Sequence, residues 1–208
     1  MRWLVLRGRN ITSIMKYDIN QINSLIRNRR SVFPKMYTGE QVPRHVVEKM
    51  LENANWAPTH KFTEPWRFTV FYGEGVKKFA EFQADLYRQR TGANPTFDES
   101  TYLKLKEKPL MASCIIAIGM KRDPENRIPE IEEIAAVSCA VQNMYLTATA
   151  YGAGCYWSTG GPTFWDEARE FFKLAPEDKL LGFLYVGMPV DKEFGSTRGA
   201  WEDKVTWV

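Results

Sequence analysis

The sequence predicts an α+β or mixed three-layer fold in a single domain. Segments with helical and strand-like patterns alternate irregularly along the 208 residues. Hydrophobic residues make up 44% and charged residues 25%, which is ordinary for a folded protein with a proper core. Residues 131–151 are apolar nearly all round, so we expect them to form a long helix at the centre of the fold.

The first predicted helix covers residues 18–29. Asp18 can cap its first turn, with Gln21 three residues later as in a capping box. Pro34 prevents the helix from continuing. The apolar stripe of this helix has helical spacing and consists of Ile19, Ile22, Leu25 and Ile26.

A second helix is expected to begin at residues 38–41, which repeat the capping-box pattern, and to end at Pro58. An irregular loop follows over residues 57–66. Residues 67–72 are rich in β-formers and are closed by Gly73 and Gly75, which predicts a short strand. The next elements are predicted as a helix at 76–90, a loop at 91–98, a helix at 99–108, a buried strand at 110–120 and a polar turn at 121–129.

The long helix at 131–151 is expected to stop at Gly152 and Gly154. A short strand at 155–157, a helix at 164–172 and a buried strand at 180–188 complete the predicted core. The tail, residues 191–208, is polar and ends in a β-prone segment, 205–208, which has no neighbour in sequence to pair with.

The composition narrows the class of function. The net charge of +3 comes from mixed charges without a basic stripe, so the sequence predicts no nucleic-acid partner, and its apolar runs are too short to span a bilayer. Cys114, Cys139 and Cys155 are an odd number without metal-ligand spacing, which indicates no disulfide framework, no metal site and a reducing, cytoplasmic location. Residues 1–16 look like an N-terminal extension without a targeting signal, and Met15 is an alternative start to Met1.

Three segments can carry chemistry, and each has a plainer interpretation. Residues 29–31, Arg-Arg-Ser, can surround a phosphate, or the cations can simply complement the negative end of a helix. Residues 56–68 form a rigid loop with His60 and Lys61, suited to ligand binding or to packing on Trp66. Residues 152–161 are rich in glycine and can offer backbone N–H groups to a ligand, or serve as a helix cap and turn.

No set of side chains forms a recognisable catalytic group. His45 and His60 are not paired at metal-ligand spacing, and no nucleophile motif is present. An enzyme of this sequence therefore needs a cofactor to carry the reaction.

Taken together and in this order, the three segments resemble the nitroreductase family of FMN-dependent NAD(P)H oxidoreductases, most closely its short members with an Ala-Pro-x-His-Lys…Pro-Trp loop. The resemblance covers residues 17–208, the predicted FMN-binding domain. It implies a mainly antiparallel sheet flanked by helices and a homodimer with FMN at the subunit interface. In that dimer each C-terminal tail crosses to the partner's sheet, and the helix at 131–151 is part of the dimer core.

The resemblance also implies site residues. The implied cofactor-binding residues are Arg29, Arg30, Ser31, Trp56, His60, Trp157, Ser158, Thr159 and Arg198. A nicotinamide-side region is implied for Thr147, Ala148, Thr149, Ala150, Tyr151 and Gly152. Phe62, Glu64 and Trp56 depart from the family pattern, which leaves the redox tuning and substrate preference open.

The implied activity is the reduction of nitroaromatic, quinone or related conjugated acceptors by NAD(P)H, in alternating steps on FMN. Dehalogenation, flavin fragmentation and non-catalytic flavin binding remain alternatives on the same fold. The sequence does not decide the physiological acceptor, NADH against NADPH, or one- against two-electron reduction.

Overall fold

A computed structural model describes residues 17–92, 97–190 and 195–208 of the chain. The predicted extension at 1–16, part of the loop at 91–98 and the start of the tail lie outside the described residues. Within the described part, four strands form one antiparallel sheet in the order β1-β2-β4-β3, which confirms the α+β prediction. The strands are β1 (Trp66–Tyr72), β2 (Cys114–Met120), β3 (Gly154–Ser158) and β4 (Lys179–Gly187).

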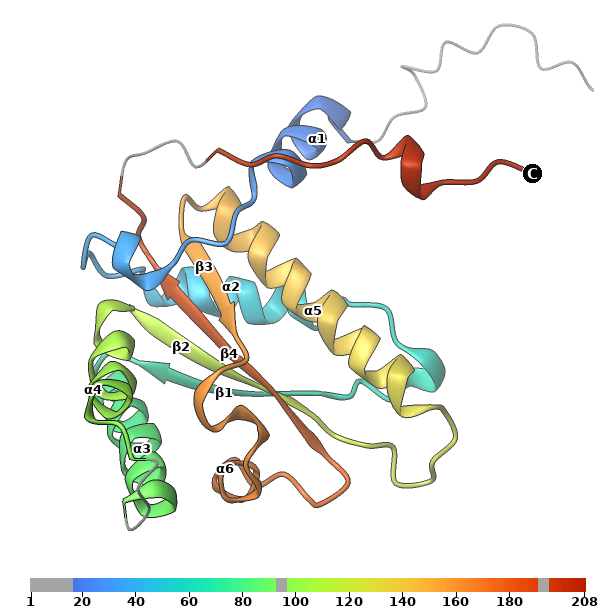
Figure 1. Cartoon of the computed structure of the whole chain (residues 1–208). Helices are drawn as coiled ribbons and strands as arrows, with labels where there is room; N and C mark the ends of the chain where they lie inside the picture. The colour runs from blue at the N-terminus through green and yellow to red at the C-terminus, as the bar shows by residue number, and fades with distance from the viewer. Residues whose placement is uncertain (1–16, 93–96, 191–194) are drawn as a thin grey trace, which may run out of the picture.

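The sheet is the middle layer of three (Figure 1). On one face lie α2 (Arg44–Ala54) and α5 (Glu130–Ala150), with α1 (Ile19–Asn28) packed on α5. On the other face lie α3 (Glu74–Thr91) and α6 (Asp166–Phe171), with α4 (Glu99–Glu107) against α3. Both faces of β2 are therefore covered, which is why all its residues are buried and its sequence is continuously apolar.

The side chains of β2 alternate between two cores, as strand geometry requires. Cys114, Ile116 and Ile118 face α2 and α5, whereas Ile115 and Ala117 face α3 and α6. Strand β1 lies at the edge of the sheet and keeps more of its side chains in solvent.

The predicted long central helix is confirmed as α5, and its first turn is held by buried charges. Glu133 is fully buried and forms an ion pair with Arg122. The backbone N–H of Asp123 also donates to Glu133 Oε1 at 2.7 Å, and Arg127 pairs with the Asp123 carboxylate at 2.8 Å. These contacts attach the polar turn predicted at 121–129 to the helix it precedes.

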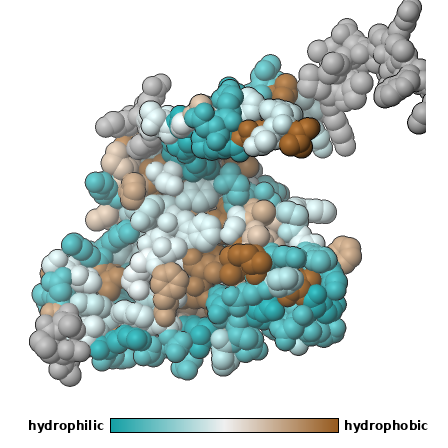
Figure 2. Space-filling view, turned by 45° about the vertical axis from the view of Figure 1, so that its right-hand side comes forward, coloured by the Kyte–Doolittle hydropathy of each residue, from teal (hydrophilic) through white to brown (hydrophobic). Residues whose placement is uncertain are grey.

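The first predicted helix is confirmed, including its cap. Asp18 Oδ1 accepts hydrogen bonds from the backbone N–H groups of Asn20 at 2.9 Å and Gln21 at 3.3 Å. None of the residues of α1 is buried, however, and its stripe of isoleucines stays largely exposed. In the view of Figure 2, apolar surface lies both on the overhanging upper part of the molecule and across the middle of the visible face.

The predicted start of the second helix is wrong. The helix α2 begins at Arg44, after Pro43, and residues 38–41 lie outside it. A residue that precedes proline is pushed away from helical dihedral angles, so Val42 cannot continue a helix from upstream. Thr38 instead accepts a hydrogen bond from the backbone N–H of Glu40, at 3.1 Å, in a local turn. The helix also ends at Ala54, earlier than Pro58.

Four other boundaries differ from the prediction. The strand predicted from 110 begins at Cys114, because Lys108–Met111 forms a 3-10 turn that contains Pro109. Gly152, with a φ of 76°, follows the end of α5, whereas Gly154 belongs to β3. The helix predicted at 164–172 is reduced to α6. Residues 205–208 form no strand in the single chain, and their pairing with a partner's sheet stays a prediction.

Candidate functional site

The edge of β3 brings two of the three predicted segments together. Ser31 forms a parallel bridge with Cys155, and the backbone N–H of Val32 donates to the Cys155 carbonyl at 2.8 Å. Gly154 permits this contact, because a Cβ atom there would lie 2.9 Å from the Val32 Cβ. The chain leaving α1 is thus fixed alongside the strand that carries Trp157 and Ser158.

The two arginines at the end of α1 have different roles in the structure. The Arg30 guanidinium turns back and donates to the carbonyls of Arg27 and Arg29, the latter at 2.8 Å, which complements the carboxyl end of the helix. The Arg29 guanidinium instead lies over the Tyr145 ring, 5.3 Å from its centroid. Within the described residues, no carboxylate forms an ion pair with Arg29.

Tyr145 of α5 connects these parts, and nothing in the sequence distinguishes it beyond its place in an apolar helix. Its hydroxyl oxygen accepts the backbone N–H of Trp157 at 2.7 Å. Burial raises the pKa of Tyr145, and the Ser31 side chain opposes that rise. The hydroxyl therefore stays protonated at neutral pH.

The turn after β3 combines a fixed tryptophan with an open backbone. The Trp157 indole N–H donates to the Leu181 carbonyl at 2.9 Å. Gly182, with a φ of 124°, makes room for this indole, because a Cβ atom there would lie 2.7 Å from Trp157 Nε1. Ser158 is half-buried, whereas Thr159 and the glycine at 160 are exposed.

The predicted nicotinamide-side residues form the last turn of α5 and the two positions after it. Thr147, Ala150, Tyr151 and Trp56 line a groove of about 530 Å³ between α1, α2 and α5. Thr147 is fixed, because its hydroxyl donates to the Asn143 carbonyl and accepts from the Asn53 amide. Among the other residues predicted here, Ala148 is buried, Thr149 bonds back to the Tyr145 carbonyl, and Gly152 is exposed.

His60 lies far from the segment at 29–31 within one chain. Its Nδ1 atom is 2.6 Å from Glu132 Oε2, in the first turn of α5. At 1.5 Å per residue, Glu132 and Tyr145 are about 20 Å apart along the helix. Figure 1 shows the same separation, with the loop around residue 60 at one end of α5 and α1 at the other.

The loop that carries His60 has an unusual backbone. Lys61, Phe62 and Glu64 have φ angles of 50°, 54° and 41°, values that residues other than glycine seldom adopt. The Lys61 ammonium donates to the Arg127 carbonyl at 3.3 Å. The Phe62 side chain is 89% exposed, so the strained loop displays an aromatic ring to solvent.

Arg198 and Trp56 lie on the surface. Among the described residues, Arg198 forms no ion pair, and its hydrogen bonds go to nearby tail atoms, Ser196 Oγ at 2.6 Å and the Thr197 carbonyl at 2.9 Å. Residues 195–208 are all exposed, and in Figure 1 the tail passes across α1 and ends beyond the body of the molecule. The hydrogen bonds of Arg198 stay within the tail and do not reach the segment at 29–31.

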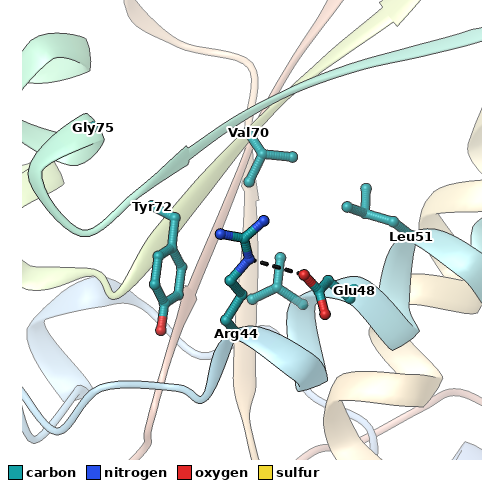
Figure 3. Close-up of a pocket in the computed structure, with 7 residues that line it drawn as sticks. Arg44, Glu48, Leu51, Val70, Tyr72 and Gly75 are labelled. Carbon is teal, nitrogen blue, oxygen red and sulfur yellow. Dashed lines mark hydrogen bonds and ion pairs between the residues drawn. The ribbon is translucent and has the colours of Figure 1, made fainter.

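A cavity of about 400 Å³ between α2 and β1 contains none of the predicted site residues (Figure 3). Its polar side chains, Arg44 and Glu48, form an ion pair with each other at 2.8 Å. In the described part of the chain, no cluster of three or more His, Cys, Asp or Glu residues can hold a metal ion. No helix among the described residues is long and apolar enough to cross a bilayer.

Comparison with known proteins identifies relatives. The model of the nitroreductase family matches residues 26–188. The Escherichia coli K12 protein named "Putative NAD(P)H nitroreductase YdjA" is 33% identical over 168 residues, covering 79% of this chain and 86% of the relative. The iodotyrosine deiodinase of Hydra vulgaris is 28% identical over 183 residues, but only 62% of its length is covered.

Solved structures show the same fold. A nitroreductase-like family protein from Bacillus cereus superposes with a TM-score of 0.75 and 27% identity, covering 93% of this chain and 98% of that one. A structure from Desulfovibrio desulfuricans, titled as a nitroreductase in complex with FMN, has a TM-score of 0.66, 24% identity and coverages of 93% and 98%.

Proposed function

This chain belongs to the nitroreductase family, and we propose that it is an FMN-dependent oxidoreductase that uses NAD(P)H to reduce nitroaromatic, quinone or related conjugated acceptors. The observation that carries the proposal is the meeting of Arg29, Ser31 and the Trp157 backbone around Tyr145. Family membership supports the oxidoreductase class, and this cluster supports the place of the cofactor.

The residues present fit the phosphate end of FMN. Arg29 is a cation held by an aromatic face rather than by a carboxylate, so its charge stays available to an anion. The Ser31 hydroxyl lies beside it and can bond to the ribityl chain. Arg30 helps through its charge, although its N–H groups already donate to helix carbonyls.

The open turn after β3 fits the flavin ring. Trp157 is held in place by its bond to Leu181, and the residues that follow, Ser158 and Thr159, can offer N–H groups to the polar edge of the ring. When bound, FMN supplies the hydride chemistry, accepting from NAD(P)H and passing reducing equivalents to the second substrate. The chain's residues bind the cofactor, orient it and exclude water, and the groove at residues 147–152 receives the nicotinamide.

We further propose a homodimer that completes the site. Glu132, the partner of His60, lies about 20 Å along α5 from Tyr145, so a second copy is the simplest source of His60 for each cofactor. The exposed isoleucines of α1 and the exposed tail, including Arg198, support such pairing. His60 or Lys61 of the second copy then places a donor near the pyrimidine side of the flavin. A cytoplasmic location is part of the same proposal.

A specialised flavin reaction is the second candidate. The similarity to an iodotyrosine deiodinase supports reductive dehalogenation as an alternative on this fold. The exposed Phe62 and the neighbouring Glu64, which stand where the family resemblance leads us to expect other residues, bear on this choice of acceptor. Turnover of a halogenated phenol, with no turnover of a quinone or nitroaromatic, would favour the alternative.

The test begins with the absorbance spectrum of the purified, FMN-supplemented protein, followed by anaerobic addition of NADH and of NADPH. We expect a flavin spectrum that bleaches with a reduced nicotinamide and returns with a quinone. A protein that binds FMN but is not reduced by either nucleotide would favour non-catalytic flavin binding. A protein that binds no FMN would overturn the proposal.

A further inference from the structure

We propose that Tyr145 is a positioning residue for the flavin, acting through two separable parts: its hydroxyl fixes the Trp157 backbone, and its ring fixes Arg29. This inference rests on the proposed function, since it assumes that the segment at 29–31 and the turn after β3 bind the same cofactor. The hydroxyl and the ring act on different ends of that cofactor, so substitutions can separate them.

The hydroxyl completes the outer edge of β3. On its inner side β3 pairs with β4, and on its outer side Val32 N–H bonds to the Cys155 carbonyl. Two residues further along the same edge, the Trp157 N–H has no strand to pair with, and the Tyr145 oxygen takes that place at 2.7 Å. Residues 31 and 32 pair with Cys155 on this same edge, so the Tyr145 hydroxyl lies where the two cofactor-binding segments meet.

The ring holds Arg29 without neutralising it. The guanidinium lies 5.3 Å from the ring centroid, within the range of a cation–π contact. A carboxylate in that position would hold the arginine equally well but would cancel the charge that a phosphate needs. An aromatic face restricts the guanidinium and leaves its N–H groups to the ligand.

The element that carries Tyr145 is rigid. Tyr145 lies in the second half of α5, between Met144 and Ala148, which are completely buried against the sheet. The Thr149 hydroxyl bonds back to the Tyr145 carbonyl at 2.8 Å. The side chain therefore extends from a fixed helix to the edge of β3, where it restricts the Trp157 backbone and the Arg29 side chain.

The test compares Tyr145→Phe, Tyr145→Leu and Arg29→Ala for their affinity for FMN and for riboflavin, which lacks the phosphate, measured by quenching of flavin fluorescence. Tyr145→Phe keeps the ring, so we expect both flavins to bind about tenfold more weakly, because the Trp157 N–H loses its acceptor. Tyr145→Leu also removes the ring, so its preference for FMN over riboflavin should fall at least about threefold further. Arg29→Ala defines the part of that preference that Arg29 supplies.

Tyr72→Phe is the matched control. The Tyr72 hydroxyl also bonds to the backbone, donating to the Val42 carbonyl at 3.0 Å, but Tyr72 lies on β1 at the opposite edge of the sheet. This variant should bind both flavins as the wild type does, while losing similar thermal stability without flavin.

Each outcome decides the question. If both Tyr145 variants bind both flavins as tightly as the wild type while Arg29→Ala loses its FMN preference, the positioning role is wrong and the proposed cofactor site stands. If Tyr145→Leu does not fold, unchanged affinity in Tyr145→Phe is sufficient to overturn it. If the wild type binds neither flavin, the proposed function fails and this inference fails with it.

Discussion

The Nδ1 atom of His60 lies 2.6 Å from Oε2 of Glu132, although the two residues are 72 positions apart in the sequence. The contact ties the loop between α2 and β1 to the first turn of α5. It also fixes which ring nitrogen of His60 faces the helix, and leaves Nε2 for another partner.

Glu132→Ala should release His60 with little effect on the fold. Both side chains are about half exposed, so the free energy of unfolding should fall by less than about 1 kcal/mol. If His60 approaches the flavin, the dissociation constant for FMN should rise by about threefold or more. Glu74→Ala, which breaks the exposed pair with Lys77 on α3, is the control and should leave FMN binding unchanged. If Glu132→Ala and Glu74→Ala bind FMN with equal affinity, the orientation of His60 does not contribute to FMN binding.

Glu133→Gln should be far more damaging than any exposed carboxylate substitution. The Glu133 side chain is fully buried, and the change leaves the nearly buried Arg122 guanidinium without a counter-ion. Removing one partner of such a pair costs about 3 kcal/mol or more, measured by urea denaturation. The exposed pair of Arg44 and Glu48 provides the comparison, because Glu48→Gln should cost no more than about 0.5 kcal/mol.

Asp123 should make the free energy of unfolding fall in acid. The hydrogen bonds from Arg127 hold the pKa of Asp123 well below its usual range. A carboxyl group with a lowered pKa in the folded state stabilises it above the unfolded-state pKa of about 4, and this contribution is lost as the pH falls further. The free energy of unfolding should therefore drop below about pH 4, and Asp123→Asn should show a smaller drop. Asp85→Asn, on the exposed side of α3, should keep the acid sensitivity of the wild type.

Gly182→Ala and Gly75→Ala should change stability in opposite directions. A Cβ atom at Gly182 would lie 2.4 Å from the Ser158 carbonyl oxygen, and its φ of 124° is unfavourable for alanine. We expect a loss of at least about 2 kcal/mol and weaker FMN binding, because β3 must move. Gly75 lies inside α3 with only an ordinary contact to Phe71, so alanine there should be neutral or stabilise by up to about 1 kcal/mol. A well-folded Gly182→Ala with normal FMN affinity would contradict the close packing of this turn.

The regular elements were predictable because their patterns are local. The stripe in α1, the continuous apolar run of β2 and the long α5 are visible in a short window of sequence, and the structure confirms them. The start of α2 differs from the prediction because Pro43 restricts the residue before it, and this restriction outweighs the capping pattern at 38–41. The capping pattern and the proline restriction favour different helix starts, and the observed start at Arg44 agrees with the proline restriction.

The candidate site was predictable only in part, for a different reason. Arg29 and Ser31 stand out as polar residues after a helix, but Tyr145 is one aromatic residue in an apolar helix and looks like any core side chain. Its importance comes from meeting Ser31 and Trp157 in space, which no short window of sequence shows. The position of His60 at the other end of α5 could not be predicted from the sequence for the same reason.

The three cysteines give a direct test of the proposed homodimer. Burial raises the pKa of Cys114 to about 12 and raises that of Cys155 as well, so neither thiol should react with a disulfide reagent at neutral pH in the folded protein. Cys139, in contrast, is exposed on the outer side of α5 in the single chain. If α5 is part of the dimer core, Cys139 should also be protected, so the native protein should show no fast thiol and the urea-unfolded protein should show three. One fast-reacting thiol in the native protein, removed by Cys139→Ser, would mean that this side of α5 faces solvent, and the second copy would have to pair through another surface.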